Sequence, residues 1–261
     1  MKKLVFLVIL LVFVGSACAD ITTGLVGWWK LDEVSGNVAV DSSVYGNNGT
    51  IGSADTWIAG GGLAFNGGSW GASGIVFANG GADLAADMNL SSAVTISFLI
   101  GGHTFGDKGY VFSGTNSASA HIMSSEAPTG DTRHFLTKMG TGPANWCWEA
   151  FNPADSRYIF AESDTRRLTI TVDFTTGGMV YYLEDDVWAS MTNAAGSFAD
   201  LTGFTIGRQL WSEFDGELED FRIYDRALSA ADVAELSVIP EPATIALLGL
   251  GGLALIRRKR S

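Results

Sequence analysis

The carboxylates of this 261-residue chain come closest to a catalytic arrangement. Glycoside hydrolysis needs two carboxyl groups on one face, and a Glu-x-Asp-x-x-Glu strand can supply them. Glu217 and Glu219 are separated by one residue, and residues 184–186 form an acidic run. Neither set has a third carboxylate at the spacing that the glycosidase motif requires. We therefore predict no glycosidase site, and a glycoside hydrolase stays a remote alternative.

The other residue types that carry catalysis are scattered along the chain. His103, His121 and His134 show no metal-ligand spacing. The sequence has no Gly-x-Ser-x-Gly elbow and no phosphate-binding loop, and no catalytic partner for Cys147 can be identified. The sequence thus predicts a protein that is not an enzyme.

The amino terminus has the three parts of a secretion signal. These are a charged start, an apolar stretch and a small-residue cleavage site, at Lys2 and Lys3, Leu4 to Val14, and Ala17 and Ala19. Cleavage after Ala19 would remove residues 1–19 and discard Cys18, leaving Cys147 without a disulfide partner. A lipoprotein with an acylated Cys18 is the alternative, although Gly15 stands where a large aliphatic residue is usual.

The carboxyl terminus carries a second predicted targeting segment, at residues 238–261. It consists of a proline-rich turn, an apolar run and a basic end, at Pro240, Glu241 and Pro242, Ala243 to Ile256, and Arg257, Arg258, Lys259 and Arg260. As a helix, the run of about 14 residues would span about 21 Å, less than the ~30 Å hydrocarbon core of a bilayer. The four cations would stay on the cytoplasmic side.

This tail resembles the PEP-CTERM sorting signal of Gram-negative bacteria. The resemblance implies that an exosortase-type enzyme processes the chain near Pro240 to Pro242. The protein would then reach the cell envelope or extracellular matrix, with a transient or permanent membrane anchor. A plain C-terminal membrane anchor is the alternative.

The region between the two predicted targeting segments is strongly acidic. The whole chain has a net charge of −12, with 16 basic and 28 acidic residues. Six of the basic residues but only one acidic residue, Glu241, lie in the terminal segments, so the middle carries 10 basic and 27 acidic residues, a net charge of −17. Phosphate binding needs clustered Lys and Arg, so nucleic acid and anionic lipid are excluded as partners of this region. Divalent cations are compatible with it.

The middle region reads as short strands. Apolar, β-branched and aromatic runs alternate with Gly, Asn, Asp and Ser, for example at Leu25 to Leu31, Val94 to Ile100, Leu168 to Phe174, Met179 to Leu183 and Gly216 to Tyr224. A single helix is indicated, with Ser229 as N-cap and Asp232 three residues later. We predict an all-β, two-sheet antiparallel β-sandwich over residues 20–237.

Two blocks of sequence carry a family resemblance. They are Gly24 to Glu33 with Asp41 to Thr50, and Phe204 to Arg208 with Phe214 to Ser229. These blocks resemble the opening and closing parts of LamG-like domains in the concanavalin A-like lectin/glucanase superfamily. The resemblance implies a jelly roll whose first and last strands are neighbours. Between about Gly67 and Ala199 it rests only on strand rhythm and on Val94 to Ile100.

The resemblance also implies a calcium site between the opening loop and the closing strand. Asp41, Asn48 and carbonyls near Gly46 would supply hard oxygen ligands. Strand alternation predicts that Glu219 shares the core-facing side with Phe221 and would need a cation or several donors there. The other interpretation is that Asp41 to Thr50 is only a turn.

Tryptophans are the candidates for stacking on sugars. Trp28 or Trp29 and the pair at 146 and 148 lie in apolar strands and are expected in the core. Those beside Gly, Asp or Ser are expected in exposed loops, as ligand contacts or as packing anchors: Trp57, Trp70, Trp188 and Trp211. The sequence therefore favours an exported, non-catalytic protein that binds carbohydrate, matrix polymer or a surface protein. The alternative is a structural matrix component without a ligand site.

Overall fold

The computed structural model describes residues 21–67, 71–88, 92–101, 109–115, 121–126, 134–138, 146–148, 165–192, 201–209 and 212–237. The two predicted terminal segments, 1–19 and 238–261, lie outside these residues, as do Trp70 and Trp211. Signal-peptide cleavage and a C-terminal membrane helix therefore stay predictions. No helix within the described ranges is both long and apolar enough to cross a bilayer.

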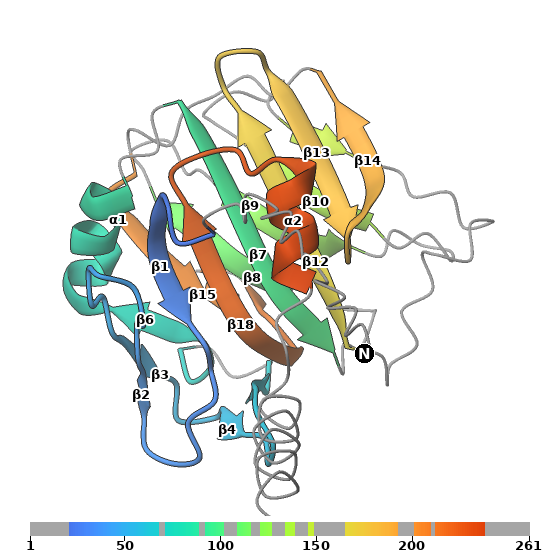
Figure 1. Cartoon of the computed structure of the whole chain (residues 1–261). Helices are drawn as coiled ribbons and strands as arrows, with labels where there is room; N and C mark the ends of the chain where they lie inside the picture. The colour runs from blue at the N-terminus through green and yellow to red at the C-terminus, as the bar shows by residue number, and fades with distance from the viewer. Residues whose placement is uncertain are drawn as a thin grey trace, which may run out of the picture.

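Two antiparallel sheets form the molecule (Figure 1). Sheet A runs β14 (Asp186–Met191), β13 (Gly178–Leu183), β12 (Arg166–Asp173), β7 (Ala93–Gly101), β18 (Gly216–Tyr224), β5 (Leu63–Phe65) and β4 (Thr56–Trp57), with β1 (Leu25–Trp29) also paired to β18. Sheet B runs β11 (Trp146–Trp148), β10 (His134–Lys138), β9 (His121–Glu126), β8 (Gly109–Thr115), β15 (Gly203–Ile206), β6 (Ile75–Phe77), β3 (Gly49–Ile51) and β2 (Val38–Ala39). The predicted all-β sandwich is confirmed.

The first and last strands are neighbours, as the resemblance implied. β1 pairs with β18 so that Trp29 lies opposite Phe221 and Trp28 opposite Arg222. A small hairpin of β16 (Arg208–Gln209) and β17 (Ser212–Glu213) stands apart from the two sheets. The two blocks of sequence therefore meet in space because they form adjacent strands.

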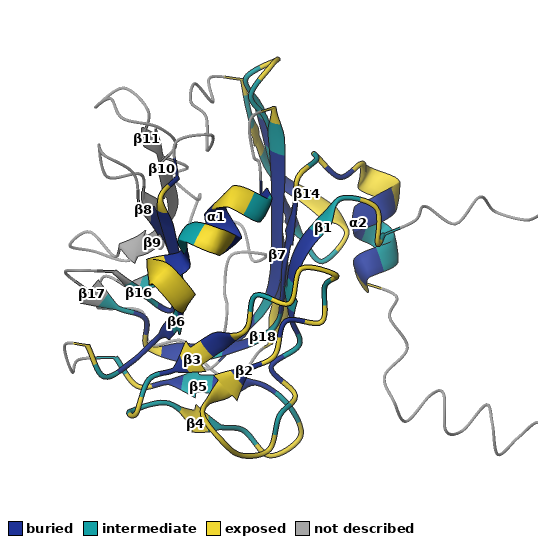
Figure 2. Ribbon diagram, turned by 90° about the vertical axis from the view of Figure 1, so that its left-hand side faces the viewer, coloured by how far each residue is buried: buried dark blue, intermediate teal, exposed yellow. Residues whose placement is uncertain are grey.

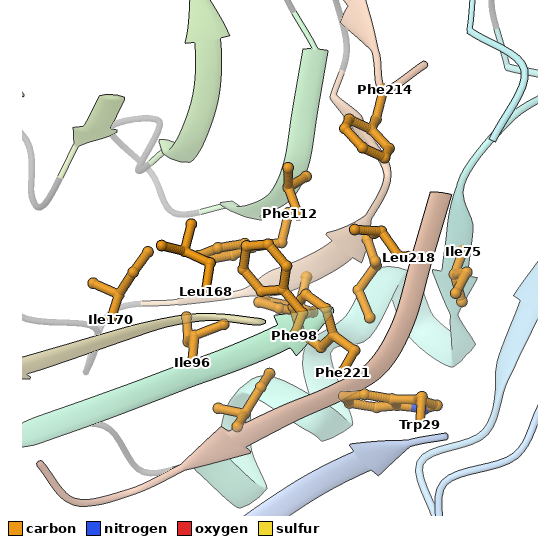
Figure 3. Close-up of a cluster of buried hydrophobic side chains, with 14 of the residues drawn as sticks. Trp29, Ile75, Ile96, Phe98, Phe112, Leu168, Ile170, Phe214, Leu218 and Phe221 are labelled. Carbon is orange, nitrogen blue, oxygen red and sulfur yellow. The ribbon is translucent and has the colours of Figure 1, made fainter. Parts of the chain in front are cut away.

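Aromatic and aliphatic side chains from both sheets fill the space between them (Figure 3). Phe98 of β7 stacks on Phe221 of β18, with ring centroids 5.5 Å apart, within sheet A. Phe112 of β8 meets Phe221 edge-on at 5.9 Å and so joins sheet B to sheet A. Trp29 is fully buried and lies 5.1 Å from Phe77 of β6. Such aromatic contacts contribute beyond the apolar area that they bury.

Two α-helices accompany the sheets within the described ranges. α2 (Ala230–Ser237) begins where predicted, because Ser229 and Asp232 exchange hydrogen bonds as a capping box: Asp232 N donates to Ser229 Oγ and Ser229 N donates to Asp232 Oδ2. α1 (Ala82–Met88) was not predicted. It follows the 3-10 turn η1 (Ala78–Gly81) and buries Leu84, Ala85 and Met88 in the core.

A β-bulge in β18 corrects the predicted strand alternation. The pairing of β18 with β7 shifts register between Glu219 and Arg222, and Asp220 adopts a positive φ of 50°. Leu218 and Phe221 consequently both face the core, although an uninterrupted strand would place them on opposite sides. The prediction that Glu219 shares the core-facing side with Phe221 is therefore wrong. Asp220 is the carboxylate that the bulge turns toward cations.

Candidate functional site

The opening loop is held by one buried carboxylate, Asp41. Its Oδ1 accepts hydrogen bonds from the backbone N–H groups of Trp28 and Ser43, at 2.9 and 2.8 Å. Its Oδ2 accepts from Ser43 Oγ and from Asn47 N, each at 2.8 Å. Because Asp41 also bridges to Trp29 in β1, these bonds fix the loop to the sheet. We call this arrangement the Asp41 latch.

Further bonds join the latch to its surroundings. Asn48 Oδ1 accepts from Asp41 N at 2.8 Å, and the indole of Trp29 donates to the carbonyl oxygen of Asn47 at 3.0 Å. Asn47 Nδ2 donates to Asp87 Oδ2 in α1 at 2.9 Å. The loop is therefore tied to β1 and to the helix that closes one side of the core.

The structure brings two of the three predicted calcium ligands together, because Asn48 Oδ1 accepts a hydrogen bond from Asp41 N. Both carboxylate oxygens of Asp41 and the side-chain oxygen of Asn48 already accept hydrogen bonds from protein groups. Glu219 lies instead against Gly61. No group of three or more acidic, histidine or cysteine side chains gathers within the described ranges. The arrangement supports the turn interpretation, and calcium binding stays a prediction.

The two described tryptophans that were predicted to lie in exposed loops, Trp57 and Trp188, have different environments. Trp188 lies on β14, buried in the core cluster, so the prediction of an exposed loop is wrong for this residue. Trp188 is buried because β14 pairs with β13, although acidic residues precede Trp188 in the sequence. Trp57 is half-buried in β4, and its indole donates to the carbonyl oxygen of Gly36 at 3.0 Å, so one edge of its ring anchors the opening loop.

The outer face of sheet A carries a buried ionic cluster. Asp220 accepts from Arg167 Nη2 at 2.7 Å through Oδ2, and from Arg222 Nε at 2.8 Å through Oδ1. The Trp28 indole donates to the same Oδ1 at 2.7 Å. Arg167 continues the network to Ser97 Oγ at 3.2 Å. The side chain of Asp220 is only 14 % exposed, so this pairing is shielded from water. Sequence reasoning missed it because the bulge cannot be read from alternation.

The charges of this cluster set the protonation state of Asp220. Burial alone would raise its pKa, but the guanidinium groups of Arg222 and Arg167 outweigh that effect and hold the pKa below its ordinary value. The Trp28 ring also lies beneath two cations, 4.6 Å from the Arg222 guanidinium and 4.7 Å from the Lys30 ammonium. The group is thus a charged, closed network that stabilises the fold.

Helix α2 covers the neighbouring part of the same face (Figure 2). Val233 and Leu236 of the helix pack on Tyr182 of β13 and Tyr224 of β18. Tyr224 is fully buried, and burial raises the pKa of its hydroxyl, although the Arg222 guanidinium acts in the opposite direction. No hydrogen bond of good geometry reaches this hydroxyl. The outer face of sheet A is therefore closed by ions at one part and by a helix at the other.

The outer face of sheet B has a different character. Register pairs line up one residue from each of five neighbouring strands, β2, β3, β6, β15 and β8: Val38, Thr50, Val76, Thr205 and Ser113. Their neighbours along the strands, such as Ile51, Ile75 and Ile206, are buried, so the row faces outward. At the usual strand separation the row is about 19 Å long. It contains no charged side chain.

The row is open at the β2 end and closed at the β8 end. Val38 is 43 % exposed and Thr50 is exposed, whereas Ser113 is buried. The hydroxyl groups of Thr205 and Ser113 donate to the carbonyl oxygen of Arg208, at 2.8 and 3.2 Å, at the start of the β16–β17 hairpin. The hairpin thus forms an end wall, and the accessible part of the row spans Val38, Thr50 and Val76.

A second carboxyl, that of the half-buried Asp55, lies beside the start of β6. It accepts from Ser73 Oγ at 2.6 Å and from Gly74 N at 2.7 Å. Burial raises its pKa despite these bonds, and the charge of Glu213 acts in the same direction. The pKa of the half-buried Asp55 is therefore shifted in the opposite direction to the pKa of Asp220.

Two packed antiparallel sheets with adjacent first and last strands define a lectin-type β-sandwich. The family model of the concanavalin A-like lectin/glucanases superfamily matches residues 71–234, and the chain belongs to this family. The PEP-CTERM protein-sorting motif matches residues 238–260, which confirms the sequence interpretation of the tail. No curated protein matches the chain.

Solved structures with a similar fold include the binding domains of two bacterial proteins. The binding domain of Paraclostridial Mosquitocidal Protein 1 is 18 % identical with a TM-score of 0.61, and covers 83 % of this chain and 52 % of its own. The binding domain of Botulinum Neurotoxin DC is 12 % identical, in complex with SialylT (TM-score 0.59) and with rat synaptotagmin II (TM-score 0.60); each covers 83 % of this chain and 52 % of its own. This chain therefore spans about half their length, and at this identity the likeness shows the fold alone.

Proposed function

We propose that the chain is an exported, non-catalytic protein that binds carbohydrate or a matrix polymer at the cell surface. One observation carries the proposal: a sandwich of the lectin-type family is followed directly by a protein-sorting motif. The first provides a rigid binding scaffold, and the second directs that scaffold to the envelope. The toxin domains with this fold, crystallised with SialylT and with synaptotagmin II, support a binding role for the architecture.

Glycan binding is tested with the full chain. It is applied to an array of neutral and acidic polysaccharides, and turnover is measured on the same panel. We expect retention on a subset of glycans and no release of reducing sugar. A blank array would favour a structural matrix component, and hydrolysis of any polymer would establish a glycosidase. Retention of a surface protein from the matrix in place of glycan would identify the partner as protein.

Sorting is the second part of the proposal. An exosortase-type enzyme would process the chain near Pro240, Glu241 and Pro242, and signal cleavage would follow Ala19. Mass spectrometry of the native protein from the envelope tests both. We expect a mature chain that begins at Asp20 and lacks Arg257 to Arg260. An intact carboxyl terminus in the membrane fraction would instead indicate a plain anchor.

Calcium binding is tested separately from sorting and glycan binding. The hydrogen bonds of the Asp41 latch support a loop that holds its shape without a metal. We expect the same melting temperature in millimolar calcium and in excess chelator. A higher melting temperature with calcium, lost on Asp41→Asn, would establish the metal site that the family resemblance implied.

A further inference from the structure

We propose that the outer face of sheet B, at its β2 edge, binds an uncharged glycan chain. The accessible row of Val38, Thr50 and Val76 forms the floor, and the loop of residues 40–48 connects β2 to β3 at this edge. This inference rests on the proposed carbohydrate binding and specifies both the surface and the chemical class of the ligand. It moves the binding surface away from the tryptophans that the sequence favoured.

Exposed apolar side chains are concentrated at this edge. Of the six large apolar residues exposed within the described part of the chain, five lie between positions 34 and 45: Val34, Val38, Val40, Val44 and Tyr45. Val34 and Val44 are 85 % and 93 % exposed. Single exposed apolar residues are ordinary, but five in twelve positions mark an interaction surface. Figure 2 shows the exposed colouring around β2, β3 and β4.

The loop that presents these side chains is rigidly held. The Asp41 latch fixes its middle, Glu33 Oε1 accepts from Val40 N at 2.8 Å, and the Trp57 indole binds the carbonyl oxygen of Gly36. A loop held open in water by this number of bonds loses little conformational freedom when a ligand binds. The structure therefore keeps apolar groups exposed in one fixed arrangement.

The charge distribution selects an uncharged ligand. No Lys or Arg occurs from residue 31 to residue 107, which includes the whole of β2, β3 and β6. The region between the terminal segments carries a net charge of −17, so an anionic polymer or an anionic membrane would be repelled. A neutral polymer meets no such barrier.

The backbone at this edge is not suited to a peptide strand. β2 is two residues long, and the next outward donor, Val40 N, is already bound by Glu33. An added peptide strand needs a run of free backbone groups along an edge. The surface therefore offers side chains, with methyl groups on Val38 and Val76 and a methyl and hydroxyl on Thr50. A pyranose presents matching C–H faces and hydroxyl groups.

The test is retention of the full chain on cellulose and chitin, with polygalacturonate as the anionic comparison. Val38→Arg and Thr50→Arg place a long side chain across the floor, while Val187→Arg makes the same change at the edge of sheet A. Val187 is 52 % exposed, so it is a matched control for Val38. We expect at least a roughly tenfold loss of neutral-polymer binding for the first two variants, and no change for the third.

The outcomes separate this inference from the proposed function. Equal binding by wild type and by both floor variants overturns the surface assignment while carbohydrate binding stands. Binding only to polygalacturonate overturns the ligand class. A wild type that binds no polysaccharide overturns both. Light scattering adds one further outcome: self-association that Val38→Arg abolishes would assign the surface to a second copy of the chain and overturn the glycan assignment. Melting curves verify that every variant is folded.

Discussion

The outer faces of the two sheets differ in what their side chains do. On sheet A, Arg167 and Arg222 converge on one carboxylate, and α2 packs over the adjoining tyrosines. On sheet B, Val38, Thr50 and Val76 form an uncharged row whose open end is solvent-exposed. One face is therefore closed by ion pairs and a helix, and the other is open to solvent at its β2 edge. If this division is correct, substitutions on the two faces should separate effects on unfolding from effects on binding.

The largest effect is expected for Asp220→Asn. The variant keeps a residue type that tolerates positive φ, but removes the charge between two buried arginines. Breaking a buried ion pair from one side costs about 3–5 kcal/mol. Urea unfolding measures the change. Asp225→Asn, on an exposed neighbour in the same segment, is the control and should change stability by less than about 0.5 kcal/mol. Equal, small effects would remove the distinction between the faces.

The second-largest loss of stability is expected at the Asp41 latch, which ties the opening loop to β1. Asp41→Ala leaves four donors of the latch without their acceptor, and we expect a loss of about 2–3 kcal/mol. Hydrogen exchange should rise between residues 33 and 48. Asp32→Ala, on an exposed acid of the same loop, is the matched control. Unchanged exchange in the Asp41 variant would show that the loop is held by other contacts.

The contributions of Asp220 and Asp55 to the free energy of unfolding should change with pH in opposite directions. The folded pKa of Asp220 is below 3.8, so its contribution is present above 3.8 and is lost as pH falls toward the folded value. The folded pKa of Asp55 is raised, so its contribution is complete below 3.8 and is lost as pH rises through the folded value. Unfolding measured from pH 2 to 7 should lose the first limb in Asp220→Asn and the second in Asp55→Asn. An unaltered profile in either variant would contradict the assignment.

A smaller effect of opposite sign is expected for Tyr224→Phe. The Tyr224 hydroxyl is buried beneath α2 and makes no hydrogen bond of good geometry, and its desolvation outweighs the effect of the Arg222 guanidinium. Removal of the hydroxyl therefore relieves a desolvation cost. We expect a gain of about 1 kcal/mol in the free energy of unfolding. Tyr45→Phe, in the exposed opening loop, should be neutral. A loss of stability in Tyr224→Phe would reveal a bond to the hydroxyl in solution.

The smallest effect is expected on sheet B. Thr50→Val exchanges an exposed, β-branched residue for another, so stability should change by less than about 0.5 kcal/mol. The same substitution removes a hydroxyl from the floor of the row and should weaken glycan retention. Val76→Thr, which adds a hydroxyl there, is its counterpart. A large change in stability with unchanged retention would reverse the roles of the two faces.

The sequence was sufficient for the architecture because strand alternation and capping are local signals. The strands around Val94 to Ile100 and Gly216 to Tyr224, and the helix after Ser229, all form close to their predicted positions. The sequence did not predict α1, because Gly80 and Gly81 indicated a turn and the apolar residues that follow span less than two helical turns. Its formation depends on packing against the core.

The site could be predicted less well, because its geometry depends on interruptions of the pattern. One extra residue in β18 replaces Glu219 by Asp220 as the buried carboxylate, and no periodicity announces it. Trp188 likewise lies two residues after the acidic run 184–186 yet is in the core, because β14 pairs with β13. The row on sheet B joins strands from five distant segments. Only the pairing register brings them together.

The position of β18 has a consequence for how the protein is made. Among the described residues it is the last strand in chain order, yet it lies inside sheet A, between β7 on one side and β5 and β1 on the other. Synthesis from the amino terminus therefore leaves two halves of this sheet unjoined until residue 224 has emerged. The strand closes the gap late, after every other strand has been delivered. Sheet A therefore cannot be completed before nearly the whole folded region has been made.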